Sequence, residues 1–85
     1  MPLLKRVTDQ ASRQQFWQSW LGGHIPAALH ARISGLIERD GTLVIFAESA
    51  AWSARLRYAV LELESDIRAA DPGLTAIRVR VLPRR

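Results

Sequence analysis

The sequence predicts an α+β domain of two layers, in which two helices cover one face of a three-stranded sheet in the order α-β-β-α-β. Apolar residues recur at steps of three and four between Trp52 and Ala70, which is the period of an amphipathic helix. Asp40-Gly41 separates two apolar runs, as in a tight hairpin. Three apolar residues near the end alternate with arginines, as in a strand with one buried face: Ile77, Val79 and Val81.

The first helix is expected to begin at Thr8, Asp9 or Ser12, whose side chains can cap it, with Ser12 and Gln15 as a capping box. Gly22-Gly23 is expected to end it, because glycine adopts the left-handed conformation that closes a helix. Residues 1–7 and 83–85 are expected to be flexible ends of a single domain spanning 1–85.

Residues 31–38 and 42–48 are predicted to form a hairpin, with Ile33, Gly35 and Ile37 on one face and Gly35 marking either a bulge or a close backbone approach. Ser49 is expected to cap a helix that Asp71-Pro72-Gly73 ends. The third strand, residues 75–82, is predicted to run parallel to the second, with Ile77, Val79 and Val81 facing the core. Whether it lies beside the second or the first strand is left open.

Composition favours a binding protein over an enzyme. The net charge is +4, and all basic residues except Lys5 are arginines, which suit phosphates and carboxylates. There is no cysteine, and His24 and His30 have no partner at zinc-binding spacing. We therefore predict no catalytic residue, metal site, cofactor or small-molecule substrate. Neither a membrane-spanning run nor a secretory signal is seen, which favours a cytoplasmic protein.

A basic line near the end of the chain is the candidate nucleic-acid surface. It comprises Arg78, Arg80, Arg84 and Arg85, and it shares a face with Phe46 if the third strand neighbours the second. Aromatic rings stack on bases and guanidinium groups bind phosphates. A solvated sheet face and a surface for a protein partner are the two alternatives.

Two tryptophans and two arginines are the candidate protein-binding residues: Trp17, Trp20, Arg55 and Arg57. Trp17 and Trp20 lie three residues apart on the first helix, so either both belong to the core, or one packs on the sheet and the other is partly exposed and available to a partner. Trp52 is expected in the core. Arg55 and Arg57 lie near the start of their helix, where the helix dipole disfavours positive charge, which hints that they serve a partner.

Several motifs resemble the DciA family, over roughly residues 16 to 82. They are Asp40-Gly41-Thr42-Leu43, Ser49-x-x-Trp52-x-x-x-Leu56-Arg57-Tyr58, Trp17-x-x-x-Leu21-Gly22 and Ile77-Arg78-Val79-Arg80-Val81. Members of that family are bacterial proteins that serve the replicative helicase DnaB where dedicated DnaC-type loaders are absent.

The resemblance implies a KH-like domain that binds DnaB and assists its loading on single-stranded DNA. The long basic tail common in the family is not present before the sequence ends at Arg85, so roles of that tail are not carried over. The sequence also lacks the Gly-x-x-Gly loop with which KH domains clamp phosphates. A KH-like RNA- or DNA-binding module without a helicase partner is the alternative function.

Overall fold

The computed structural model describes the backbone of residues 2–82 and the side chains of residues 11–82. Its elements are α1 (Pro2–His24), α2 (Ala27–His30), β1 (Ile33–Arg39), β2 (Thr42–Ala47), α3 (Ala50–Glu62), α4 (Glu64–Ala70) and β3 (Ala76–Val81). The predicted order is confirmed, with the short α2 added and the second predicted helix divided into α3 and α4.

The sheet has the order β1-β2-β3, so β2 is its central strand. β1 and β2 are antiparallel and β2 and β3 are parallel, as predicted. The third strand therefore lies beside the second, which settles the alternative that the sequence left open. Asp40 and Gly41 have φ of 52° and 80°, which is the positive-φ pair that a tight hairpin turn requires.

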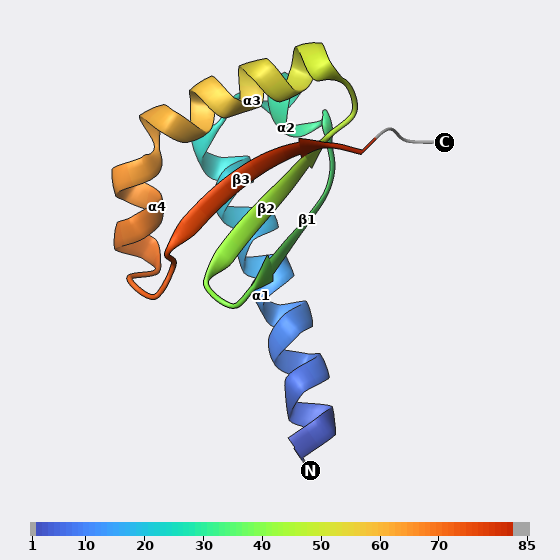
Figure 1. The fold of residues 1–85 in the computed structure, drawn as a ribbon, viewed down its shortest axis with the longest axis vertical. Coiled ribbons are helices and arrows are strands. Elements are labelled where there is room, and N and C mark those ends of the chain that lie inside the picture. The colour runs from blue at the N-terminus through green and yellow to red at the C-terminus, as the bar shows by residue number, and fades with distance from the viewer. Residues whose placement is uncertain (1, 83–85) are drawn as a thin grey trace.

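One face of the sheet and the helices enclose a single apolar core. Figure 1 shows α1 crossing behind the sheet and α3 running along one end of it. The largest fully buried side chains come from both layers: Trp17, Leu21, Leu43, Ile45, Leu56 and Ile67. Trp52, expected in the core, is half-buried and packs against its margin.

A β-bulge changes which residues of β1 face the core. Ile33 pairs with Ala47 but Gly35 pairs with Phe46, so one extra residue lies in β1 at the predicted bulge. Ile33 and Leu36 consequently both face the helices and are buried. The prediction that Ile33 shares a face with Gly35 and Ile37 is wrong, because the bulge reverses the alternation.

Both predicted limits of the first helix are wrong. α1 begins at Pro2, since proline is compatible with a first helical turn and no helix breaker follows before Gly22. It then continues through Gly22 and Gly23 to His24, and neither glycine has a positive φ. Pro26, with φ of −57° and ψ of 143°, instead directs the chain out of the helical conformation.

The second predicted helix begins at the predicted cap, Ser49, but an unpredicted break divides it into α3 and α4. The hydroxyl of Ser49 accepts a hydrogen bond of 3.3 Å from the backbone N–H of Trp52. Leu63, with φ of −96° and ψ of 3°, separates α3 from α4. In β3, Val79 is buried, but Val81 is 44% exposed, so its predicted place in the core is wrong.

Candidate partner and nucleic-acid surfaces

The face of the sheet opposite α1 carries the predicted basic and aromatic pair. In the register of β2 and β3, Val44 is opposite Arg78 and Phe46 is opposite Arg80. Because side chains directly across a sheet lie on the same face, Phe46 and the two arginines share one surface. Arg78 and Arg80 are exposed, and Phe46 is half-buried. Arg84 and Arg85 lie outside the described residues.

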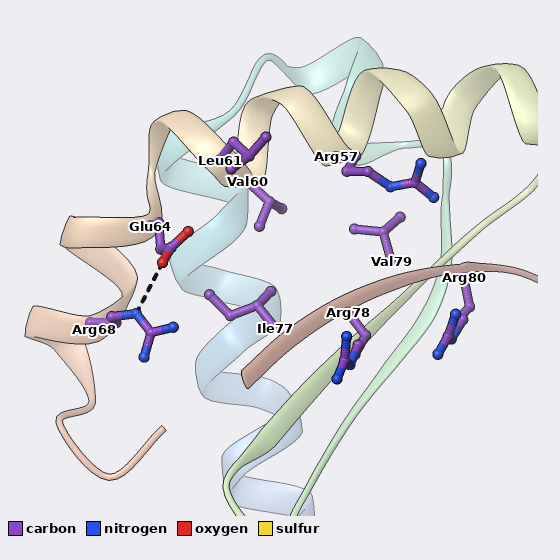
Figure 2. Close-up of a pocket in the computed structure, with 9 residues that line it drawn as sticks. All are labelled: Arg57, Val60, Leu61, Glu64, Arg68, Ile77, Arg78, Val79 and Arg80. Atoms are coloured by element: carbon purple, nitrogen blue, oxygen red, sulfur yellow. Dashed lines mark hydrogen bonds and ion pairs between the residues drawn. The ribbon is translucent and has the colours of Figure 1, made fainter. Parts of the chain in front are cut away.

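A groove between the helices and β3 brings together residues that the sequence analysis did not associate. It has a volume of about 420 Å³ and is lined by α3, α4 and β3 (Figure 2). Arg57 of α3 and Arg68 of α4 lie on its helical side, and Arg78 and Arg80 on its strand side. Arg57 and Arg68 lie on different helices, on either side of the break at Leu63, so their sequence spacing gave no sign that they share a groove.

The groove has one acidic residue, and that residue is already paired. The carboxylate of Glu64 accepts a hydrogen bond of 3.3 Å from Nε of Arg68, one helical turn away. Figure 2 draws this contact at the α4 end of the groove. Among the lining side chains, Arg68 pairs with this carboxylate and Arg57, Arg78 and Arg80 add positive charge, so the groove attracts anions.

The outer face of α3 is a second exposed surface. Tyr58 is 74% exposed and Leu61 is 61% exposed, three residues apart on the helix. Arg55 and Arg57 are exposed on the same helix, and such exposure is necessary for their predicted contact with a protein partner. Shallow cavities of about 360 and 300 Å³ flank Tyr58. Aromatic and arginine side chains of this kind are enriched at protein interfaces.

Trp52 lies beside this face, between two cations. The guanidinium carbon of Arg32 is 4.9 Å from the centre of the Trp52 ring, and that of Arg55 is 5.3 Å from it. Arg32 also forms an ion pair of 3.4 Å with Glu48. These contacts hold Arg55 over an aromatic ring while leaving it exposed, so its charge is presented outward.

The two tryptophans of α1 differ in accessibility. Trp17 is fully buried, and its indole N–H donates a hydrogen bond of 2.6 Å to Glu38, so it presents no side-chain surface to a partner. Trp20 is half-buried and stacks on the His24 ring at 3.7 Å. The sequence pattern did not distinguish them, because both belong to one wide apolar stripe.

A polar cluster beneath the sheet joins three elements. Glu38 of β1 accepts hydrogen bonds from Trp17 and from Arg13, whose Nη2 is 2.7 Å away. Arg13 also pairs with Asp71 after α4. Burial raises the pKa of Glu38, but the hydrogen bonds from Arg13 and Trp17 and the charge of Arg13 hold that pKa below its ordinary value. The cluster ties α1 to the sheet and to the end of α4.

The histidines have structural partners. A ring nitrogen of His24 lies 2.7 Å from the carbonyl oxygen of Trp20, and one of His30 lies 3.1 Å from that of Gln18, so each ring N–H donates to backbone. Across the described side chains, no three histidine, aspartate or glutamate residues are grouped to hold a metal ion. None of the helices within residues 2–82 is long and apolar enough to cross a membrane.

The fold and these surfaces define a small α+β domain with arginine-rich exposed faces. The family model described as Dna[CI] antecedent, DciA, matches residues 2–80. The chain therefore belongs to the DciA family, as its motifs predicted. This family is related by name to the loaders of the DnaB helicase, and it is a family of loaders and adaptors rather than of catalysts. No curated protein matches the chain.

Proposed function

We propose that this protein is a non-enzymatic adaptor of DNA replication, acting in the cytoplasm, that binds DnaB and assists its loading on single-stranded DNA. The observation that carries the proposal is the family match over residues 2–80. The adaptor would bind the loadable state of the helicase ring more tightly than the closed state, and that difference in affinity would shift the ring toward loading.

We assign the helicase contact to the outer face of α3. Tyr58 and Leu61 supply exposed apolar area, and Arg55 and Arg57 supply charge beside it. Trp20, half-buried on α1, stays a predicted contact, whereas Trp17 is left out because it is fully buried. An apolar centre bordered by arginines fits a partner surface with apolar and acidic side chains.

We assign the DNA contact to the face of the sheet opposite α1, which we call the open face. Phe46 provides a ring on which a base can stack, and Arg78 and Arg80 provide guanidinium groups for the phosphates on either side. Arg84 and Arg85 would extend the same basic line. This surface alone would also serve the second candidate function, a KH-like RNA- or DNA-binding module without a helicase partner.

The test is co-purification of DnaB with the tagged full chain at low salt. The wild type is expected to retain the helicase, and Arg55→Glu combined with Tyr58→Ala is expected to weaken retention about tenfold or more, as for loss of interface hot spots. Arg39→Glu is the matched control, because Arg39 is exposed on the open face of the sheet, away from α3.

Absence of DnaB from the wild-type sample would reject the adaptor. If oligonucleotide binding persisted in that case, the second candidate function would replace it. Equal weakening by Arg39→Glu would show that net charge, and not the α3 face, governs retention.

A further inference from the structure

The free edge of β3 opens on the groove described above. Within the described sheet, β3 has one neighbouring strand, β2. The N–H of Ala76 donates to Gly41 at 3.2 Å, and that of Leu82 donates to Ala47 at 2.8 Å. Because successive residues of a parallel strand bond alternately to opposite sides, the backbone groups of Ile77 and Val79 point away from β2. An unpaired strand edge of this kind is a template for another strand.

The floor of the groove is aliphatic. Val60 and Leu61 come from α3, and Ile77 and Val79 come from β3 (Figure 2). No aromatic side chain is among the lining residues, so the groove offers no ring on which a nucleobase could stack. Apolar side chains of a peptide would instead find apolar neighbours on both walls.

The charges are arranged to match an extended peptide. Ile77 and Val79 point toward the helices, whereas Arg78 and Arg80 point to the open face, because side chains alternate along a strand. An added strand would alternate in the same way. Its apolar residues would lie on the aliphatic floor, and its acidic residues would lie beside Arg78 and Arg80.

We propose that the edge of β3 and this groove bind an extended acidic segment of a partner protein, which adds a strand to the sheet. Backbone hydrogen bonds to Ile77 and Val79 would supply the register, and the arginines would select for carboxylates. This goes beyond the proposed function, since it uses the free edge of β3, although the groove shares Arg57 and Leu61 with the outer face of α3. It shares Arg78 and Arg80 with the proposed DNA surface, so peptide and DNA should compete.

The experiment titrates the full chain with a short synthetic peptide of alternating glutamate and valine, by calorimetry and by amide hydrogen exchange. The exchange of the Ile77 and Val79 amides is expected to slow about tenfold or more when the peptide is bound. Arg78→Ala combined with Arg80→Ala is expected to weaken peptide binding about tenfold. Circular dichroism checks that the variant is folded.

Two controls decide the outcome. A peptide of the same composition with its glutamates and valines in separate blocks should bind at least about tenfold more weakly, because it loses the alternation. Phe46→Ala should weaken binding of a thymidine oligonucleotide but not of the peptide, which separates failure of this proposal from failure of the DNA contact. Equal binding of both peptides, or protection of the Ile77 and Val79 amides by the oligonucleotide, would overturn the proposal. Arg78 and Arg80 would then be explained as charged residues that keep an exposed edge strand from pairing with other chains.

Discussion

At the scale of single residues, Glu38 is a partly buried carboxylate that two residues of α1 contact. Its side chain is 17% exposed, and its carboxylate accepts hydrogen bonds from Arg13 and Trp17. The bulge in β1 turns Glu38 toward the helices, where a charge is stable only when it is paired. The cost of placing this carboxylate at the core margin is therefore offset by two donors that α1 positions.

Glu38→Gln is expected to lower the free energy of unfolding by about 1–3 kcal/mol, because a neutral amide cannot satisfy the guanidinium of Arg13 as a carboxylate does. Urea denaturation followed by circular dichroism measures the change. Glu62→Gln is the matched control, since Glu62 is exposed on α3, and it should change stability by less than about 0.5 kcal/mol. Equal changes in the free energy of unfolding for the two variants would show that Glu38 has no special structural role.

Stability should also depend on pH through Glu38. Its pKa in the folded state lies below the ordinary value of 4.5, so its contribution is present above that value and is lost as the pH falls through the folded pKa. The free energy of unfolding should decrease as the pH is lowered from about 5 to 3, and Glu38→Gln should reduce that slope. A slope unchanged by the substitution would assign the acid sensitivity to other carboxylates.

At the scale of elements, the hairpin turn between β1 and β2 is held by backbone conformation and by a neighbouring loop. Gly41 has φ of 80°, and a Cβ there would lie 3.0 Å from Oγ1 of Thr75 and 3.2 Å from the carbonyl oxygen of Gly73. The backbone N–H of Thr75 donates to the carbonyl of Gly41 at 2.7 Å. The turn thus also fixes the entry of the chain into β3.

Gly41→Ala is expected to destabilise the protein by about 1–3 kcal/mol, through the positive φ and the close backbone approach. Gly23→Ala is the matched control, because Gly23 is helical and a Cβ there meets nothing within 4 Å. That substitution should instead stabilise the protein by about 0.5–1 kcal/mol. Thermal denaturation compares them, and two shifts of the same sign would contradict this account.

The sequence predicted correctly those features that depend on only a few neighbouring residues. The Asp40-Gly41 turn and the Ser49 cap depend on residues within one turn, and both are confirmed. The end of α1 was misplaced because the helix continues through Gly22 and Gly23, which lie between the buried residues Leu21 and Ile25. The break at Leu63 has no glycine or proline to mark it. Tertiary contacts override intrinsic preferences in such places.

At the scale of the whole molecule, three arginine-rich surfaces surround one small core. They are the outer face of α3, the groove beside β3 and the open face of the sheet. The open face was predictable, because alternation places Arg78 and Arg80 together and the register adds Phe46. The groove was not, since Arg68 and Arg78 come to line one groove only through the crossover that connects β2 to β3.

Binding of a thymidine oligonucleotide should weaken as salt increases. Each phosphate contact on single-stranded DNA contributes about 0.7 to the slope of log K against log salt, so Arg78→Ala combined with Arg80→Ala should reduce that slope by about 1.4. The control removes Arg32 and Arg55, the two arginines beside Trp52, and should leave the slope unchanged. Filter binding at several salt concentrations measures both slopes, and equal reductions would mean that overall charge alone governs binding.

The contrast between Trp17 and Trp52 gives the molecule two internal optical reporters. Trp17 is sealed from solvent, so its emission should shift only when the core opens. Trp52 lies half-buried between Arg32 and Arg55, so a ligand that displaces either guanidinium should change its emission while the core stays closed. In a Trp20→Phe variant, docking on α3 and loss of the fold should therefore give different shifts of the emission wavelength.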